Sequence, residues 1–367
     1  MVRAALFIRE NPFGNGKSST LYVFRQLLNH LQKNKEISFT LFCNDPPTKK
    51  LPESVTFRKV DHPYTIKSLF EFKKFLKEGN RVDVVISFDI SGVLPIIYAK
   101  RIGLPAIVIN FAANNIIKFI YTKDLKYFEP IKSLLQLLVF AFADKIITAS
   151  SFGIENNKIF KHKIVAIGHG VDTTIFKPLS NVTKKENKIL FVGKVEKRKG
   201  LDIALKVFKY LYDEVPSLTF CIIGEKNKYI TKLINKYPLY LRKNIIFKNN
   251  LNVEELVQEY NSAKVLILLS RYDGWGLVVT EALACGTPVV VSLNTGAKDI
   301  VEKYNCGLVV DLSDTEFIAN ALAKILKDRK YYKKLSKSAQ KAVKEYSWNK
   351  VANRFLRCII DVVNNGG

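Results

Sequence analysis

Short apolar runs alternate with longer amphipathic stretches along this chain of 367 residues. The runs are rich in Ile and Val and alternate little between apolar and polar positions, as in strands buried on both faces of a parallel sheet. They form two series. The first series comprises Ala4–Ile8, Ser38–Cys43, Val82–Ser87, Ala106–Ile109, Lys145–Ala149 and Lys163–Ile167. The second comprises Ile189–Val192, Leu218–Ile223, Asn244–Phe247, Val265–Leu269, Pro288–Val291 and Gly307–Val310.

The stretches between the runs have the apolar spacing of amphipathic helices. Examples are Ser19–Gln32, Lys67–Lys77, Leu201–Tyr212 and Asp314–Leu326. Strands alternating with helices predict an α/β fold, and two series predict two Rossmann-like domains facing a cleft. Ligands of such sheets bind at the carboxyl ends of the strands, which we expect to face that cleft.

We expect the first domain to span residues 1–170 and the second to span residues 171–347. The polar segment Leu179–Lys188 is interpreted as a linker, because the second strand series begins just after it. Residues 348–367 follow the second series, and Ser347–Val363 has one apolar helical face. This last helix either caps the second domain or returns to the first.

The chain has 58 basic and 33 acidic residues, a formal net charge of +25. Such a charge suggests binding to nucleic acid or to a membrane surface. However, the excess is +12 in residues 1–170 and +11 in residues 171–347, and no block of five or six like charges occurs. This even spread favours a general compositional bias, and nucleic acid is not the expected partner.

The composition also indicates a soluble, cytoplasmic protein. A membrane-spanning helix needs about 20 apolar residues, and the longest candidate, Ser133–Ala143, has 11. The sequence after Met1 lacks the features of a signal peptide. The five cysteines include no CxxC pair, and four of them lie in or beside apolar runs, as expected of buried thiols. The four histidines have no metal-ligand spacing, so no metal site is predicted.

The stretch Ser270–Val290 carries the clearest chemical signal. Gly274 and Gly276 permit a tight turn and close approach of the backbone to a ligand, and a helix is expected to begin near Leu277. The start of a helix offers free amides and a positive dipole end to a phosphate. Asp273 and Glu281 lie before and along this helix, where both can face a ligand. The alternative is an ordinary strand–loop–helix unit with solvated acids.

A second stretch, Phe191–Gly200, places Lys194 and Lys199 in a short loop between a predicted strand and a helix. Two lysines so arranged can point at one anion. The alternative is a pair of solvated lysines in a lysine-rich chain.

Together these stretches resemble the retaining glycosyltransferases of the GT-B fold, family four. That family has two basic residues five apart between glycines, here Lys194 and Lys199, and two acids around a Gly-aromatic-Gly-Leu pattern, here Asp273 and Glu281. Three further stretches match: Ala143–Ser150, Gly168–Pro178 and Ser347-Trp348. The resemblance implies that the last helix returns to the first domain, which would bind the acceptor while the second binds a nucleotide sugar.

The resemblance also implies residue roles. Lys194 and Lys199 would hold the donor diphosphate, Glu281 the nucleotide ribose, and Asp273 the hydroxyls of the transferred hexose. Backbone of the Gly274–Leu277 turn, including Trp275 and Gly276, would bind the sugar and the phosphate. The remaining donor contacts would come from backbone at Gly193, Gly224, Asn249 and Leu251. The co-substrate would be a UDP- or GDP-sugar, and neither a metal nor another cofactor is expected.

Gly14, Gly16 and Lys17 follow the first predicted strand, where the family has a glycine-rich loop near the donor phosphate and the acceptor. The alternative is an ordinary helix-capping turn. Gly16-Lys17-Ser18 also imitates the end of a P-loop, but that motif requires a glycine at position 11, where this chain has Asn11. We therefore reject an ATPase interpretation.

The sequence departs from the family pattern at three positions. Asp273 replaces the commoner glutamate, and Lys194 replaces an arginine, so bidentate phosphate binding is lost. The histidine usual after the strand Ala106–Ile109 is absent, and Asn110 and Asn114 occupy that stretch. His169 is a further candidate on the acceptor side, with loop packing as the alternative.

Two stretches mix basic and aromatic residues, Lys67–Lys77 and Lys118–Lys132. They suit the surface of a membrane carrying a lipid-linked acceptor, which would make the protein peripheral at the inner membrane surface. The alternative is half-buried domain helices with solvated lysines.

The sequence thus predicts a hexosyltransferase that extends a glycan or a lipid-linked acceptor. Two alternatives remain open at this point. The first keeps the fold and makes nucleic acid the acceptor, which predicts binding with a steep salt dependence. The second is a non-catalytic nucleotide-sugar-binding protein, against which the intact lysine and acid sets argue.

Overall fold

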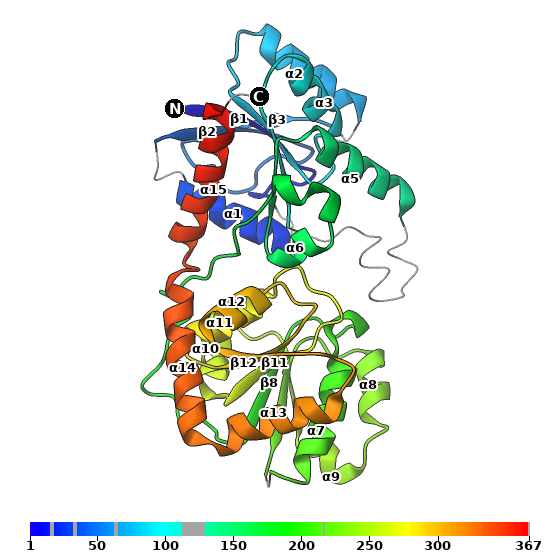
Figure 1. The fold of residues 1–367 in the computed structure, drawn as a ribbon, viewed down its shortest axis with the longest axis vertical. Coiled ribbons are helices and arrows are strands. Elements are labelled where there is room, and N and C mark those ends of the chain that lie inside the picture. Colours follow the sequence, from blue (N-terminus) through cyan, green and yellow to red (C-terminus); the bar gives the residue numbers. More distant parts are fainter. Residues whose placement is uncertain (15–17, 32–34, 62–64, 112–128, 216, 366–367) are drawn as a thin grey trace. The chain divides into compact units, whose positions relative to one another are not determined.

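The computed structural model describes residues 1–14, 18–31, 35–61, 65–111, 129–215 and 217–365. The chain forms two compact units (Figure 1). Unit 1 comprises Met1–Gly170 and Trp348–Gly367, and unit 2 comprises Val171–Ser347. Unit 2 is therefore inserted between the body of unit 1 and its last helix.

Unit 1 is built on a parallel sheet of seven strands in the order β3-β2-β1-β4-β5-β6-β7. The strands are β1 (Val2–Phe7), β2 (Ile37–Cys43), β3 (Val55–Lys59), β4 (Val84–Phe88), β5 (Ala106–Asn110), β6 (Lys145–Thr148) and β7 (Ile164–Ala166). In β1 and β5, the central side chains are fully buried, which explains their continuous apolar sequence. The order of the strands reverses direction between β1 and β4.

The described helices of unit 1 are α1 (Ser19–Leu31), α2 (Ile66–Lys77), α3 (Val93–Arg101), α5 (Pro130–Phe142), α6 (Ser151–Glu155) and α15 (Trp348–Asn364). The last helix, α15, lies beside α1, as the red and blue helices of Figure 1 show. Trp348, Val351, Phe355 and Ile359 of α15 are buried. The predicted return of this helix to the first domain is confirmed.

Unit 2 has a parallel sheet of six strands in the order β10-β9-β8-β11-β12-β13. Its strands are β8 (Lys188–Val192), β9 (Thr219–Ile223), β10 (Ile245–Lys248), β11 (Val265–Leu268), β12 (Val289–Ser292) and β13 (Gly307–Val310). Its helices are α7 (Leu201–Tyr212), α8 (Lys228–Ile234), α9 (Leu239–Arg242), α10 (Val253–Ser262), α11 (Leu277–Ala284), α12 (Lys298–Tyr304), α13 (Thr315–Lys327) and α14 (Arg329–Lys344). The predicted α/β fold with two Rossmann-like sheets is confirmed.

The two ends of unit 2 are joined by a hydrogen bond from the Val171 amide to the Tyr346 carbonyl, at 2.8 Å. On the unit 1 side, Gly170 lies against Trp348, since a Cβ at Gly170 would come within 2.4 Å of the indole ring. The chain passes between the units twice, after Gly170 and before Trp348. In each unit the two chain ends at these crossings contact each other.

Strand β3 has no counterpart among the predicted strands. Of its five residues only Val55 is buried, and the others, including Thr56 and Arg58, are half-buried or exposed. This edge strand therefore lacks the continuous apolar run by which the other strands were recognised. The prediction of buried thiols is confirmed for Cys43, Cys221, Cys285 and Cys306.

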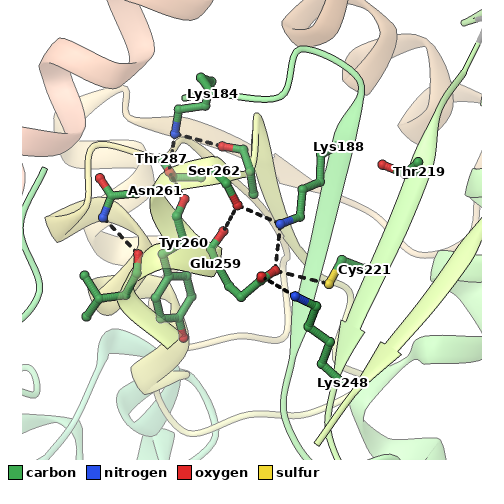
Figure 2. Close-up of polar contacts among 12 residues, drawn as sticks. Lys184, Lys188, Thr219, Cys221, Lys248, Glu259, Tyr260, Asn261, Ser262 and Thr287 are labelled. Atoms are coloured by element: carbon green, nitrogen blue, oxygen red, sulfur yellow. Dashed lines mark hydrogen bonds and ion pairs between the residues drawn. The ribbon is translucent and has the colours of Figure 1, made fainter. Parts of the chain in front are cut away.

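The interpretation of Leu179–Lys188 as a linker is wrong. The amide of Leu179 donates to Asn261 Oδ1 at 2.8 Å. Lys184 Nζ donates to the Ala263 carbonyl and to Thr287 Oγ1, at 2.9 and 3.0 Å (Figure 2). Burial lowers the pKa of Lys184 to about 8. The segment is polar, yet Lys184 and Lys188 are bound by partners of unit 2, so it is part of that unit.

Candidate functional site

The carboxyl ends of β8 and β11 lie next to each other in the sheet of unit 2. The chain builds β9 and β10 on one side of β8, and then β12 and β13 on the far side of β11. Between β8 and β11 the following loops run to opposite sides, which leaves a crevice where ligands of open α/β sheets bind. The candidate residues Lys194, Lys199 and Asp273 come from the loops that follow these two strands.

Lys199 and Asp273 form an ion pair between the loop after β8 and the loop after β11. Lys199 closes the 3₁₀ turn Lys197–Lys199 after β8, and Asp273 lies in the loop between β11 and α11. Lys199 Nζ lies 2.5 Å from Asp273 Oδ2, and the two side chains are 15% and 13% exposed. Burial by itself raises the pKa of Asp273, but the charges of Lys199 and Arg198 outweigh it and hold the pKa below its ordinary value. The carboxylate is therefore ionised at neutral pH.

Three further contacts join the loop before α11 to the loop after β8 and to the start of α7. Arg198 Nη1 donates to the Tyr272 carbonyl at 2.9 Å, and the Arg271 amide donates to the Arg198 carbonyl at 2.8 Å. The Arg271 guanidinium also binds both carboxylate oxygens of Asp202, at 2.6 and 2.8 Å. These contacts fix the backbone on both sides of the Lys199–Asp273 pair.

Gly200 permits the close packing of these loops. It has a φ of 69°, and a Cβ there would lie 1.7 Å from the Leu269 carbonyl oxygen. Gly193 and Gly224 follow β8 and β9, and a Cβ at Gly224 would lie 2.3 Å from the Gly193 carbonyl oxygen. The structure thus brings these predicted donor residues together at the carboxyl edge. Asn249 and Leu251 follow the edge strand β10, Asn249 exposed and Leu251 half-buried.

Helix α11 begins directly after the turn that contains Gly274, Trp275 and Gly276. Gly276, with a φ of 92°, is the N-terminal cap, and Leu277 is the first helical residue. The first amides of a helix have no acceptor within the helix, so this end is electropositive. Lys194, the second predicted lysine, is exposed in the loop after β8.

The loop after β12 supports this turn, and the sequence did not single it out. The Asp273 amide donates to the Asn294 carbonyl, and the Gly296 amide donates to the Asp273 carbonyl, both at 2.9 Å. The Ala297 amide donates to the Trp275 carbonyl at 2.8 Å. Asn294-Thr295-Gly296 has the composition of a turn after a strand, but nothing in the sequence pairs it with Asp273.

Glu281, on α11, is bound by a tyrosine that the sequence analysis missed. Tyr260 Oη, on α10, donates to Glu281 Oε2 at 2.7 Å. Burial raises the pKa of Glu281, and the hydrogen bond from Tyr260 lowers it by a smaller amount, so the pKa lies above its ordinary value. Tyr260 is fully buried, and its position on α10 is that of a core aromatic residue, so the sequence carries no signal of this contact.

The residue before Tyr260 anchors α10 to the sheet. Figure 2 shows Glu259 between Lys188 and Lys248, with Cys221 beside it. Glu259 Oε2 lies 2.6 Å from Lys188 Nζ, and Oε1 lies 2.7 Å from Lys248 Nζ. Burial raises the pKa of Glu259, but the two lysine hydrogen bonds outweigh it and hold the pKa below its ordinary value. An ionised carboxylate thus fixes α10 beside Glu281.

The candidates in unit 1 are only partly described. Gly16, Lys17 and Asn114 lie outside the described residues. Gly14 is buried in a turn, where its amide donates to the Asn11 carbonyl at 2.9 Å. Asn110 ends β5, and among the described residues its Nδ2 has no hydrogen-bond partner. Phe111, the next residue, packs against His169 in a T-shaped arrangement, with 4.9 Å between the ring centroids.

The two basic segments differ in what the structure describes. Lys67–Lys77 lies within α2, in which Phe72 is buried, Leu69 and Leu76 are half-buried, and Lys67, Lys74 and Lys77 are exposed. This is the packing of an amphipathic domain helix. Most of Lys118–Lys132 lies outside the described residues, and Lys132 belongs to α5. In the described part of the chain, no helix combines the length and the hydropathy needed to cross a membrane.

Two Rossmann-like units with a final helix returning to the first define the GT-B fold of the nucleotide-sugar glycosyltransferases. A solved structure of sucrose-phosphate synthase from Thermosynechococcus elongatus superposes with a TM-score of 0.81 over 100% of both chains, at 18% identity. An α-1,4-N-acetyl-D-galactosaminyltransferase of Campylobacter jejuni is 26% identical over 360 residues, which cover 92% of this chain and 94% of that protein.

Residues 172–342 match the family model described as glycosyl transferases group 1. An uncharacterized glycosyltransferase of Methanocaldococcus jannaschii is 31% identical over 179 residues, 48% of this chain. The match spans about half the length of that relative, 45%, and 54% of a second one. The second unit is thus similar in sequence to the glycosyl transferases group 1 family.

Proposed function

We propose that the protein is a retaining hexosyltransferase. It moves a hexose from a UDP- or GDP-linked donor to a hydroxyl of a glycan or lipid-linked acceptor. The observation that carries the proposal is the Lys199–Asp273 pair at the crevice between β8 and β11, beside the start of α11. A cation, a carboxylate and a helix N-terminus at this point suit a donor that is anionic at its diphosphate and rich in hydroxyls at its sugar.

In this proposal, Lys199 binds the donor diphosphate without leaving Asp273. An ammonium group has three N–H donors, and Asp273 takes one of them. The exposed Lys194 supplies a second cation, and the amides at the start of α11 supply hydrogen bonds. The carboxylate of Asp273 then accepts hydrogen bonds from hydroxyls of the hexose at the positions that Lys199 leaves free. Glu281 has one oxygen bound by Tyr260, and the other oxygen accepts a ribose hydroxyl.

The transfer proceeds on one face of the sugar. The oxygen of the acceptor hydroxyl bonds to the anomeric carbon on the face from which the diphosphate leaves, so the configuration is retained. The bond between that carbon and the phosphate oxygen breaks, and the leaving phosphate takes the proton of the hydroxyl. Lys194, Lys199 and the helix end stabilise the negative charge that develops on the diphosphate. The proposal therefore assigns this role to protein groups rather than to a metal or a cofactor.

The binding of UDP and GDP, and of their hexose conjugates, tests the proposal. We expect at least one of these nucleotides to raise the melting temperature of the protein. Lys199→Ala weakens its binding at least about tenfold, because a charge-assisted hydrogen bond is lost. The matched control is Lys327→Ala, whose side chain is 52% exposed and pairs with Glu214 at the surface of the same unit. Equal affinity of both variants for the nucleotide would show that the donor site lies elsewhere.

The proposed acceptor is a lipid-linked glycan. The Campylobacter jejuni relative is named for an undecaprenol-linked glycan substrate. Its similarity over most of both chains supports a lipid-linked acceptor here. A transferase that acts on such an acceptor works at the membrane surface without a membrane-spanning helix.

A further inference from the structure

A small pocket lies at the edge of the sheet of unit 2, between α8, α9 and β10. Its volume is about 130 Å³, well below the roughly 300 Å³ at which pockets for drug-sized ligands begin, so it suits a small ligand. Ile245 and Phe247 of β10 form its apolar wall, since alternate side chains of a strand share one face. Strand β9 separates β10 from β8, so this pocket is distinct from the Lys199–Asp273 pair.

Three side chains that line the pocket carry N–H donors. Lys226 and Arg242 are cations, and Asn235 has an amide group. The ammonium group of Lys226 lies 5.5 Å from the centroid of the Phe247 ring. None of the described residues that line the pocket is acidic. Two cations and an amide without a carboxylate fit an anionic ligand.

Arg242, the last residue of α9, is a half-buried cation without a counterion in the described part of the chain. Its Nε is buried and has no hydrogen-bond partner among the described residues. The two other half-buried arginines described in unit 2, Arg198 and Arg271, pair with the carboxylates of Glu196 and Asp202. A buried donor without an acceptor costs free energy, and an anion in the pocket removes that cost.

The segments that carry the two cations are held in place by side-chain hydrogen bonds. Asn244 Nδ2 donates to the Tyr240 carbonyl at 2.9 Å, which fixes the end of α9. Asn227 Nδ2 donates to the Val195 carbonyl at 2.7 Å, which fixes the start of α8 directly after Lys226. A pocket whose walls are already ordered loses little conformational entropy when it binds a ligand.

The sequence around the pocket has charge of one sign. Residues 226–253 contain seven basic residues and no acidic residue, whereas the whole chain has 33 acidic residues for 58 basic ones. Of these seven, Lys248 is paired with Glu259. The even charge of the two halves of the chain therefore hides a local positive region, and such a region attracts anions.

We propose that this pocket binds a phosphate group, either as inorganic phosphate or as the end of a small phosphomonoester. The guanidinium of Arg242 binds two phosphate oxygens, and Lys226 and Asn235 donate to the others. A phosphomonoester carries about −1.5 to −2 charges at pH 7, which two cations match better than they match a single carboxylate. The bound anion joins α8 to α9. This site goes beyond the proposed function and does not depend on it.

Calorimetric titration of the full chain with sodium phosphate, against sodium chloride at the same ionic strength, tests the proposal. We expect Arg242→Gln to lower the affinity for phosphate at least about tenfold, because charge-assisted hydrogen bonds are lost. Lys226→Gln, at an exposed position, should lower it at least about threefold. Unchanged affinity in both variants would overturn the proposal.

The matched control is Lys232→Gln, which removes the same charge from an exposed position of α8 outside the pocket. It should leave phosphate binding unchanged. If it weakens binding as much as Lys226→Gln does, phosphate is attracted only by the general charge and the proposal is wrong.

The melting temperature separates ligand binding from a structural role of Arg242. Without phosphate, we expect Arg242→Gln to melt no lower than the unchanged protein, because Arg242 has no partner to lose. With phosphate, only the unchanged protein and Lys232→Gln should gain stability. A lower melting temperature of Arg242→Gln without phosphate, together with unchanged phosphate affinity in Lys226→Gln, would assign Arg242 a structural role and overturn the proposal.

Two further probes identify the source of the phosphate group and its relation to the donor site. Tighter binding of glycerol 3-phosphate than of inorganic phosphate would support a phosphomonoester, and weaker binding would support free phosphate. Arg242→Gln should bind UDP or GDP as the unchanged protein does. If it loses nucleotide and phosphate affinity equally, the pocket belongs to the donor site and the proposal is wrong. If the unchanged protein binds phosphate here and neither nucleotide, only the proposed function fails.

Discussion

Tyr260 donates a hydrogen bond of 2.7 Å to Glu281, and the residue before it, Glu259, binds two lysines of the sheet. Consecutive residues of a helix point about 100° apart, so α10 can contact the sheet with one side chain and α11 with the next. The Lys188–Glu259–Lys248 cluster therefore supports the position of Tyr260, and Tyr260 in turn orients Glu281. This chain of contacts links a buried ionic cluster to a candidate ribose-binding carboxylate.

Tyr260→Phe removes the hydrogen bond to Glu281 and keeps the aromatic ring. We expect nucleotide affinity to fall about threefold to tenfold, since a typical hydrogen bond contributes about 0.5–1.5 kcal/mol. The pKa of Glu281 rises further, because the Tyr260 hydroxyl is the group that lowers it. The pH below which nucleotide binding is lost therefore moves upward, which isothermal titration across pH measures.

The matched control for this prediction is Tyr240→Phe, because Tyr240 is 52% exposed on the surface of the same unit. It should leave both the affinity and its pH dependence unchanged. A Tyr260→Phe protein with the same pH profile as the control would show that Tyr260 does not orient Glu281.

The Lys199–Asp273 pair also contributes to the stability of unit 2. We expect Lys199→Met to lower the free energy of unfolding by about 2–4 kcal/mol, because Asp273 is left as an uncompensated buried charge. The double variant Lys199→Met with Asp273→Asn should recover part of this loss, and a double-mutant cycle by urea denaturation measures the coupling. Strictly additive losses would argue against a functional ion pair.

Because of the Lys199–Asp273 pair, we expect the free energy of unfolding to fall at acid pH. The pKa of Asp273 is lower in the folded protein than its ordinary 3.8, so its contribution to stability is complete above that value. The contribution is lost as the pH falls through the lower, folded-state pKa. Asp273→Asn should therefore flatten the acid side of the stability profile, and an unchanged profile would contradict the assignment.

Glu259→Gln tests whether the Lys188–Glu259–Lys248 cluster anchors α10 to the sheet. The substitution leaves Lys188, which is 5% exposed, without its carboxylate partner. We expect a loss of about 2–4 kcal/mol in the free energy of unfolding. Glu214→Gln is the control, because its ion pair with Lys327 is about half exposed on both sides and contributes about 0.5 kcal/mol or less. Similar losses in the two variants would mean that the cluster does not anchor α10.

Gly200→Ala tests the close packing of the loops after β8 and β11. A Cβ at position 200 would lie 1.7 Å from the Leu269 carbonyl oxygen, so the backbone must move, and we expect a cost of at least about 3 kcal/mol. Gly286 has a similar φ, 73°, but the Cβ of Gly286→Ala would meet only side-chain atoms, the end of Gln340 at 3.0 Å and Ser336 Oγ at 3.5 Å. This control should cost about 1 kcal/mol. Thermal or urea unfolding distinguishes the two.

Much of the fold could be predicted from the sequence, because strands buried on both faces leave continuous apolar runs such as Val265–Leu268. Strand β3 has only one buried residue and leaves no such run. The segment Leu179–Lys188 looked like a linker, because a lysine that is buried with its charge satisfied has the same sequence signature as an exposed one.

The candidate site was predictable where its residues share a local stretch of sequence, such as Lys194 with Lys199. Asp273 and Glu281 share a stretch of sequence, whereas Tyr260 and Asn294 reach that stretch through the fold. Helical spacing predicts that Tyr260 is buried but not which carboxylate its hydroxyl meets. Contacts between residues that are distant in the chain have no local pattern.

The insertion of unit 2 between Gly170 and Trp348 has a consequence for how the two units can be separated. Both crossings of the chain must be cut before the units come apart, so a single proteolytic nick leaves them covalently joined. Because Val171 and Tyr346 are hydrogen-bonded to each other, the ends of unit 2 already lie together. Residues 171–347 therefore begin and end at one place, while the last helix belongs to the first unit.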